Sequence, residues 1–448
     1  MLSFDLASLH AGIVDPEMDS MRILSETALR FPDALSFSSG APYDGNHDLS
    51  ALTFYIDRYI KHLRERGVPE ARITRLLFQY GPVNGLIQDE VALMLKRDED
   101  IDVPAEAIMI THGFQEAALV ALRGLFTSPD DVLLAVSPAY VGIRGAARML
   151  DIPVRGVAEG PEGLDPQTVA ETARAVRAEG KRVAALYLVP DFNNPSGTVL
   201  PRAARQRLLD VAAEEDFVVL EDNPYGLFAR DGESQPTLKS LDTRRRVVYL
   251  GSFAKSAFPG ARLGYLVADQ EVTEPSGTVR TLAQTLSKAK AMFTVGSSTL
   301  SQAVIGGYLV EHDHDLRSAT RELAAVYLER LDTVLAALDE HFPAGGDHGV
   351  AWNTPRGGFF LTLTVPFTAD LAAMERSARD YGVSWAPMTM FHLDGGGERE
   401  IRLGFSNLAP DAIREGIARL ARFVTDASKD GATTTPKHPA PEIPEGQA

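Results

Sequence analysis

Lys255 stands in the stretch YLGSFAKSAFPGARLGYL, directly after an apolar segment, with Ser252 before it and Arg262 after it. A lysine at the end of an apolar strand is either a solvated loop cation or a desolvated amine that can form an imine with a carbonyl group. Arg262 offers a planar fork of donors that suits a phosphate. The stretch is not a nucleotide-binding P-loop, because the glycine spacing before the lysine differs.

Two carboxylates, Glu221 and Asp222, end the apolar segment FVVLED, and Tyr225 follows in the same turn. A buried acid is costly without a cationic partner. Asp222 can therefore pair with a protonated ring nitrogen, while Tyr225 offers a hydroxyl to the same ligand. A helix cap or a salt bridge explains such carboxylates equally well, and these residues alone leave the alternatives open.

Two further turns carry groups that can bind a ligand. Gly113, in THGFQEA, permits a tight turn before a helix whose first free N–H groups, at Phe114 and Gln115, form an anion site. In FNNPSG, the Asn194-Pro195 pair fixes an extended backbone from which the Asn194 amide can reach a phenolic oxygen. Each is also an ordinary strand-to-helix turn, and neither indicates a function by itself.

These residues stand where predicted strands end or helices begin. Apolar runs predict buried strands at 107–111, 131–136, 183–189, 217–222, 246–251 and 261–268, with helices such as 114–126 and 201–215 between them. This alternation predicts an α/β fold with a mostly parallel sheet covered on both faces. Ligands bind at the carboxyl edge of such a sheet, where these motifs would meet.

Beyond residue 318 the pattern changes to a long helix, two short strands and a final helix, which predicts a smaller α+β unit. We expect residues 1–51 to form an N-terminal segment of the small domain and 52–318 the large α/β domain. Residues 319–426 would complete the small domain. Residues 427–448 are rich in Pro, Thr and charge, and are expected to be a disordered tail.

The composition excludes several classes of function. With 44 Lys and Arg against 61 Asp and Glu, the net charge is −17, which argues against nucleic acid as a partner. The chain has no Cys, so it has no disulfide, thiolate metal site or catalytic thiol. It lacks a membrane-spanning apolar run and a secretory signal, so we expect a cytoplasmic protein. The sequence EHDHD is interpreted as a solvated loop, and no metal site is predicted.

Taken together, YxxPxxxNPSG, EDxPYG and SFxKxxxPGxRxGY occur in an order and spacing that resemble the class I/II aminotransferases among fold type I pyridoxal-phosphate enzymes. The chain is most similar to the branch with aminoadipate, kynurenine and aromatic aminotransferases, from about Arg22 to Val424. The resemblance implies pyridoxal 5'-phosphate as cofactor. It also implies a mostly parallel seven-stranded sheet in a large domain, joined to a smaller α+β domain.

The resemblance assigns roles around the cofactor ring. Lys255 would form the Schiff base and move the proton at the substrate α-carbon, and Asp222 would keep the pyridine nitrogen protonated. Asn194 and Tyr225 would bind the phenolic oxygen, and Tyr140 would stack on the ring. The residues implied to hold the phosphate are Gly113, Phe114, Gln115, Ser252 and Arg262.

Three matches concern the substrate and the assembly. Arg402 resembles the arginine that grips the substrate α-carboxylate, and Gly40 in SSGAP resembles the glycine of the N-terminal substrate loop. Tyr80 resembles the tyrosine that reaches the phosphate of the neighbouring subunit, which implies a homodimer with shared active sites. Departures at Ser39 and Ala254, and in the long segment 46–75, leave the substrate open.

The implied reaction moves the amino group of an L-amino acid to a 2-oxo acid. An alternative keeps the cofactor but catalyses elimination, cyclisation or carbon–carbon bond formation in a natural-product pathway, for example on S-adenosylmethionine. A more remote alternative is a non-catalytic regulator that binds the cofactor. The negative charge and the presence of Lys255, Asp222 and Arg402 argue against that alternative.

Overall fold

The computed structural model describes residues 2–45, 48–160, 163–230, 234–346 and 348–432. Its larger sheet has seven strands in the order β2-β8-β7-β6-β5-β3-β4. The strands β7, β6, β5, β3 and β4 each pair in parallel with the next strand in this order. Strand β8 runs antiparallel to both β7 and β2. The predicted mostly parallel seven-stranded sheet is therefore confirmed. Its strands are β2 (Ile108–Thr111), β3 (Asp131–Ser137), β4 (Val154–Ala158), β5 (Arg182–Leu188), β6 (Val218–Asp222), β7 (Val247–Ser252) and β8 (Gly264–Val267).

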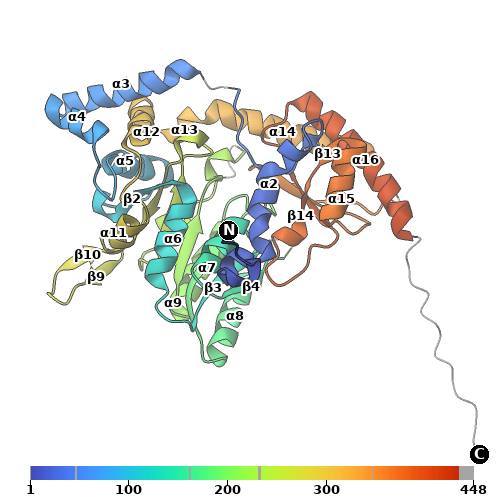
Figure 1. Ribbon diagram of the computed structural model, residues 1–448, viewed down its shortest axis with the longest axis horizontal. Coiled ribbons are helices and arrows are strands. Elements are labelled where there is room, and N and C mark those ends of the chain that lie inside the picture. Colours follow the sequence, from blue (N-terminus) through green and yellow to red (C-terminus); the bar gives the residue numbers. More distant parts are fainter. Residues whose placement is uncertain (1, 46–47, 161–162, 231–233, 347, 433–448) are drawn as a thin grey trace, which may run out of the picture.

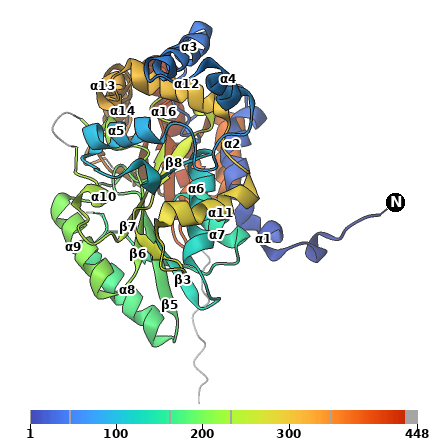
Figure 2. The ribbon, with the colours of Figure 1, turned by 90° about the vertical axis from the view of Figure 1, so that its left-hand side faces the viewer.

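Helices cover both faces of the larger sheet (Figure 2). Successive strand residues point to opposite faces, so on β3 Leu133 packs with α6 and α7, whereas Leu134 packs with α8 and α9. Continuous apolar strands are the consequence of this double burial. The helices of this unit are α3 (Leu49–Glu65), α4 (Glu70–Phe78), α5 (Gln88–Glu99), α6 (Gly113–Leu125), α7 (Val141–Met149), α8 (Pro166–Ala178), α9 (Arg202–Glu214), α10 (Leu238–Leu241), α11 (Leu282–Phe293), α12 (Thr299–Glu311) and α13 (Leu316–Ala319). A short hairpin, β9 (Glu271–Thr273) and β10 (Val279–Thr281), projects beside α11 (Figure 1).

The smaller sheet is antiparallel and has the order β11-β12-β15-β14. Its apolar side packs under the helices α14 and α16, around the fully buried Trp385. A separate parallel pair joins β1 to β13, so the N-terminal segment contributes to this unit. The elements are β1 (Leu35–Ser36), β11 (Ala351–Trp352), β12 (Phe360–Thr364), β13 (Val383–Ser384), β14 (Ala386–Pro387), β15 (Glu400–Gly404), α14 (Arg321–His341), α15 (Leu371–Arg376) and α16 (Pro410–Ala432).

The N-terminal helices α1 (Ala11–Val14) and α2 (Asp19–Arg30) lie against the larger unit as well. Met21 and Leu24 on α2 pack with Val141 at the start of α7 and with Ala386 on β14. Helix α2 therefore spans the junction between the two units (Figure 1).

The structure differs from the sequence-based expectations in several places, among them the short strands β1, β9, β10, β11, β13 and β14, which were not predicted. Strand β4 was not predicted, because VRGVA contains Arg and Gly and is only partly buried. Strand β8 begins at Gly264 rather than 261, since Arg262 takes a left-handed backbone conformation with φ 50°. Helix α16 continues to Ala432, into the segment expected to be a disordered tail, because its apolar face still packs at Ala427. Residues 433–448 lie outside the described part of the chain.

None of the helices in the described ranges is long and apolar enough to span a lipid bilayer.

Candidate active site

A cavity of about 290 Å³ opens at the carboxyl ends of β5, β6 and β7, where the larger sheet faces the smaller one. The motif residues reach it because each follows one of these neighbouring strands or lies opposite them. The predicted site residues that line this cavity are Gly40, Phe114, Gln115, Tyr140, Asn194, Asp222, Tyr225, Ser252, Lys255, Arg262 and Arg402.

Asp222 ends β6 and turns its carboxylate into the cavity, with only 4% of the residue exposed. The hydroxyl of Tyr187, on the neighbouring strand β5, donates to Asp222 Oδ2 at 2.8 Å. Burial raises the pKa of Asp222 to about 7, although the Tyr187 hydrogen bond opposes the shift. Such a carboxylate is suited to a cationic partner.

Glu221, its neighbour in sequence, points to the opposite face of the sheet. Its carboxylate accepts hydrogen bonds of 2.7 Å from the backbone nitrogens of Leu238 and Lys239 and so caps α10. The helix-cap explanation therefore holds for Glu221 but not for Asp222.

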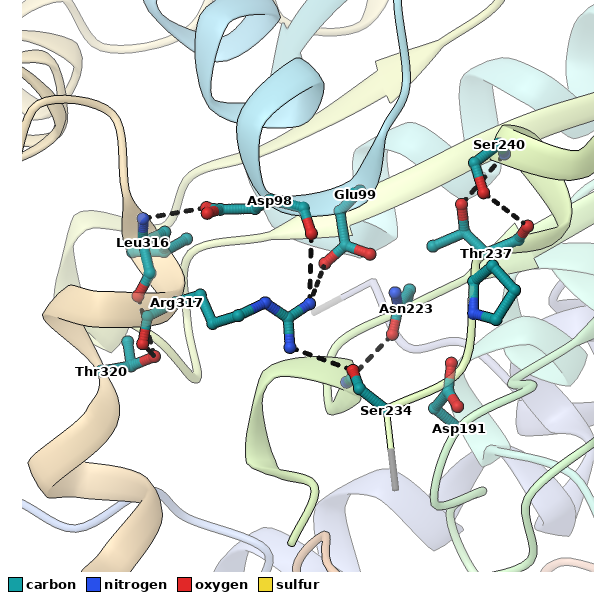
Figure 3. A network of polar contacts seen from close by, with 12 residues as sticks. Asp98, Glu99, Asp191, Asn223, Ser234, Thr237, Ser240, Leu316, Arg317 and Thr320 are labelled. Carbon is teal, nitrogen blue, oxygen red and sulfur yellow. Dashed lines mark hydrogen bonds and ion pairs between the residues drawn. The ribbon is translucent and has the colours of Figure 1, made fainter. Parts of the chain in front are cut away.

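A network of polar contacts around Arg317 lies near the turn that follows Asp222 (Figure 3). Arg317 on α13 donates to the backbone oxygen of Asp98 at 3.2 Å and to Ser234 Oγ at 3.0 Å. Its guanidinium also lies 3.7 Å from the carboxylate of Glu99. Asn223 accepts a hydrogen bond of 3.0 Å from the backbone of Gly226, which closes the turn itself.

Lys255 lies in the loop after β7, and its Nζ donates to the backbone oxygen of Gly40 at 2.8 Å. Burial, together with the charges of Arg402 and Arg262, lowers the pKa of Lys255 to about 8. An amine with this pKa is neutral in a sizeable fraction of molecules near neutral pH, as a nucleophile or a proton carrier must be.

A set of hydrogen-bond donors lies beside the lysine. Gly113 opens α6 with φ 67°, a backbone conformation that favours glycine, and a Cβ built on it would lie 3.0 Å from Arg262 Nη2, so a larger residue would crowd the arginine. Within the described ranges, the guanidinium of Arg262 has no hydrogen-bond or ion-pair partner, although its backbone N–H donates to the Pro259 oxygen. With the hydroxyl of Ser252 and the N–H groups at the start of α6, these groups fit the phosphate of the implied cofactor.

Three side chains are placed to contact a flat ring between Asp222 and the cavity mouth. Tyr225 and Asn194 are both buried and hydrogen-bond to each other, which opposes the rise in the pKa of Tyr225 that burial causes. Tyr140 packs edge-on against Phe114, with ring centroids 5.6 Å apart, and burial raises its pKa to about 12.

Arg402, on β15, closes the cavity from the smaller sheet. Its Nη1 donates to Asn194 Oδ1 at 2.7 Å and its Nη2 to the backbone oxygen of Ser38 at 2.5 Å, whereas its buried Nε has no partner in the described part of the chain. The guanidinium lies between the rings of Phe360, at 4.3 Å, and Phe391, at 4.6 Å. Burial lowers its pKa to about 10, so a carboxylate ligand would stabilise the charge.

The remaining wall was not identified from the sequence. On the side of the smaller unit it includes Met21 and Leu24 from α2, Ser38 and Ser39 from the loop after β1, and Phe360 from β12; the other lining residues are Ala41, Val189, Pro224 and Ala254. The only signal for these residues was the resemblance of SSGAP to a substrate loop, and nothing in the sequence pointed to α2 or to Phe360.

Tyr80 is the predicted site residue that lies elsewhere. It is 90% exposed, in the loop after α4, and lines a separate groove with His112 and Val295. Within one chain it therefore does not meet Lys255.

Comparisons with known proteins agree with this geometry. A family model described as aminotransferase class I and II matches residues 32–420. The chain is 44% identical over 421 residues to (S)-3,5-dihydroxyphenylglycine transaminase of Amycolatopsis orientalis, a match that covers 94% of each protein. It is 30% identical to 2-aminoadipate transaminase of Thermus thermophilus, over 87% of this chain and 90% of the relative.

Solved structures show the same fold. A multiple substrate aminotransferase from Thermococcus profundus superimposes with a TM-score of 0.79 at 26% identity, over 95% of this chain and 99% of that one. A kynurenine aminotransferase from Pyrococcus horikoshii, in complex with PMP and with kynurenine as substrate, gives a TM-score of 0.77 at 27% identity, over 95% and 97%.

The family match spans most of the chain, and the relatives named above are aminotransferases. The predicted fold class, transferase activity and cofactor are thereby confirmed, and transamination is supported over elimination or carbon–carbon bond formation. The chain belongs to the class I and II aminotransferases and is a pyridoxal-phosphate-dependent transferase.

Proposed function

We propose that this aminotransferase takes the amino group from an amino acid with an uncharged, aromatic side chain and gives it to a 2-oxo acid. The observation that carries this proposal is the distribution of charge in the cavity. Its charged residues are Asp222, Lys255, Arg262 and Arg402, all assigned to the cofactor or to the α-carboxylate. In the described part of the chain, the rest of the lining is uncharged.

Helix α2 supports this choice of side chain. Its apolar residues Met21 and Leu24 face the cavity, whereas Arg22 is exposed and paired with Asp19 and Glu26. A substrate with an acidic side chain would therefore be desolvated without a cation beside it, which is costly. An aromatic ring would instead bury apolar surface against Met21, Leu24 and Phe360.

The names of two relatives point to the same class. One is a transaminase of (S)-3,5-dihydroxyphenylglycine, and another, 29% identical over 93% of each protein, is an aromatic-amino-acid aminotransferase of Thermococcus litoralis. Both substrates carry an aromatic ring close to the amino group.

Pyridoxal phosphate, when bound, supplies an aldehyde that condenses with amines and a protonated ring that withdraws electrons from the substrate α-carbon. Lys255 would hold the cofactor through its Nζ and, once displaced by the substrate amine, carry the α-proton. The lowered pKa of Lys255 suits both tasks, because only the neutral amine is a nucleophile or a base.

The other residues would orient the two ligands. Asp222 would face the ring nitrogen, and the positive charge there would offset the burial that now raises the pKa of this carboxyl. Arg402 would bind the α-carboxylate through the guanidinium nitrogens that face the cavity. Asn194, held by Arg402, would direct its amide nitrogen to the phenolic oxygen beside Tyr225.

A homodimer is part of the same proposal. Large apolar side chains are exposed around the groove that contains Tyr80, and contiguous apolar surface of this kind marks an interface. Phe78, Tyr80 and Met292 are 78%, 90% and 83% exposed. In a dimer across this groove, Tyr80 would reach the phosphate of the partner subunit.

Steady-state kinetics with a panel of amino donors test the substrate class. We expect kcat/KM for 3,5-dihydroxyphenylglycine or phenylalanine to exceed that for 2-aminoadipate by about tenfold or more, because the acidic side chain meets no cation. Release of the 2-oxo acid is followed by mass spectrometry, with Lys255→Ala as the inactive control. A preference for the acidic donor would contradict the proposal.

A charge introduced on α2 sharpens this experiment. Leu24→Arg places a cation on the cavity wall and should shift the preference toward 2-aminoadipate. Leu29→Arg is the matched control, because Leu29 lies on the same helix but is 79% exposed. If both variants keep the same preference as the original chain, the wall does not select the substrate.

A further inference from the structure

A chain of hydrogen bonds crosses from the end of β4 to the two loops that carry Tyr140 and Asn194. Thr198 Oγ1 donates to Glu159 Oε2 at 2.9 Å, and the hydroxyls of Thr198 and Ser196 are 2.9 Å apart. The side-chain nitrogen of Asn193 donates to Ser196 Oγ at 3.0 Å and to the backbone oxygen of Pro138 at 3.2 Å. None of these side chains lines the cavity.

Glu159 fixes the direction of the hydrogen bonds that the Thr198 and Ser196 hydroxyls make. The Thr198 hydroxyl donates its single proton to the Glu159 carboxylate, so its oxygen must accept from Ser196. Ser196 Oγ is then free to accept one N–H of Asn193, and the other N–H reaches the Pro138 oxygen. With the carboxylate removed, the hydroxyls can reverse, and the Asn193 amide is then certain of only one acceptor, the Pro138 oxygen.

The two ends of the chain meet the site through the backbone. Asn193 is 4% exposed and directly precedes Asn194, while Pro138 stands two residues before Tyr140. The Asn193 amide is thus a direct bridge between the loop that presents Tyr140 and the loop that presents Asn194. The separation of these loops determines how a ring fits between Tyr140 and the residues on its far side.

We propose that Glu159 is a positioning residue for the cofactor ring, acting through Thr198, Ser196 and Asn193 to hold the Tyr140 and Asn194 loops at a fixed separation. The proposal rests on the assignment of Tyr140 and Asn194 to the cofactor. It adds a residue outside the cavity, on the far side of the Asn194 turn, to those that determine how the ring is held.

Thr198→Val tests it, because valine keeps the shape of threonine and removes the hydroxyl. We expect the dissociation constant for pyridoxal phosphate, titrated into cofactor-free protein, to rise about tenfold, the effect of one hydrogen bond to a charged group. The circular dichroism of the bound cofactor should weaken, since it reports how rigidly the ring is held. Thr198→Ser, which keeps the hydroxyl, should stay within about twofold of the original chain.

Glu159→Met serves as the second variant and should have the larger effect. Methionine removes the carboxylate to which Thr198 donates at 2.9 Å, and with it the acceptor that fixes the direction of the hydroxyl hydrogen bonds. The melting temperature of each cofactor-free variant shows whether it is folded. Should Thr198→Val not fold, the same titration of Glu159→Met decides the question.

If a folded Thr198→Val or Glu159→Met protein keeps the original cofactor affinity and dichroism, the proposal is wrong, even if its melting temperature changes. Only the stability of the protein would then depend on these hydrogen bonds. Failure of the underlying assignment looks different. In that case Asn194→Ala and Tyr140→Ala, which remove the proposed ring contacts, would themselves leave the cofactor affinity and dichroism of the protein unchanged.

Discussion

The guanidinium of Arg402 donates to the side-chain oxygen of Asn194 at 2.7 Å, which links the residue proposed to bind the substrate with one proposed to bind the cofactor. Because a guanidinium only donates, the Asn194 amide must turn its nitrogen away from Arg402, toward Tyr225. The orientation of a cofactor ligand is thus set by a residue from the other sheet.

Arg402→Lys tests separately whether Arg402 binds the substrate carboxylate and whether it orients Asn194. A single ammonium cannot donate to Asn194 and Ser38 and also bind a carboxylate through a planar fork. We expect KM for the amino acid to rise on the order of a hundredfold, the loss of a charge-assisted bidentate contact, and the affinity for pyridoxal phosphate to fall by a smaller factor. Enzyme kinetics and cofactor titration measure the two effects, with the exposed Arg22→Lys as control. A rise in KM with unaltered cofactor affinity would show that Asn194 does not depend on Arg402.

Asp222 predicts how the stability of the cofactor-free protein depends on pH. Its folded-state pKa of about 7 lies above the ordinary value of the unfolded chain, so the folded protein binds the proton more tightly. The stabilisation is complete below about pH 4, the ordinary range of the carboxyl group, and is lost as pH rises through about 7.

Asp222→Asn removes the buried charge while keeping the shape, so the melting temperature of the cofactor-free variant should exceed that of the original chain at pH 8. The difference should shrink toward pH 5. Thermal unfolding followed by fluorescence at both pH values measures it, with the exposed Asp130→Asn as control. A variant that is less stable at pH 8 would mean that a cation in the site already neutralises Asp222.

The pKa of Lys255 predicts the pH dependence of cofactor capture. Because only the neutral amine attacks an aldehyde, the rate of covalent binding should rise with pH and level off above about 8. Arg402 lowers the pKa of this lysine, so Arg402→Gln should move the midpoint to higher pH. Stopped-flow absorbance with pyridoxal phosphate records both curves, and Lys255→Arg should show no covalent phase. An unchanged midpoint in Arg402→Gln would rule out electrostatic coupling between the two residues.

Mixed dimers test whether the active sites are shared. Lys255→Ala and Tyr80→Asp should each be inactive, the second because a negative charge would lie against the phosphate. If Tyr80 serves the partner's site, a hybrid of the two variants contains one intact site, and activity should return after the proteins are unfolded and refolded together.

A mixture of Lys255→Ala with Asp222→Asn is the matched control for the hybrids. Each of these substitutions damages the site of its own subunit, so both sites of the hybrid carry a defect and neither is intact. Return of activity in neither mixture would assign Tyr80 to a role within its own subunit.

The cofactor side of the site could be predicted because its residues follow neighbouring strands of one sheet. Asp222 ends β6 and Lys255 follows β7, and these strands pair in parallel, so their carboxyl ends must meet. Tyr187 shows the limit of this reasoning. Its contact with Asp222 depends on the register that places Tyr187 beside Leu220, and a sequence does not reveal which residues of two strands pair.

The substrate side could be predicted only in part. Arg402 and Gly40 were found through their motifs, but Met21, Leu24 and Phe360 come from a helix and a strand far apart in sequence. Their meeting is decided by how the smaller sheet packs on the larger one. Apolar residues on an amphipathic helix such as α2 look the same whether they face a core or a ligand.

The division of the cavity between two sheets bears on how such a protein can acquire a new role. Reactivity is built on the edge of the larger sheet, whereas most of the wall that meets the substrate comes from α2, the loop after β1 and β12. Mutations in those segments can alter which amino acid is accepted while the reactive groups stay in register. Substitutions in one unit can therefore change which substrate is bound, while the reactive residues of the other unit stay the same.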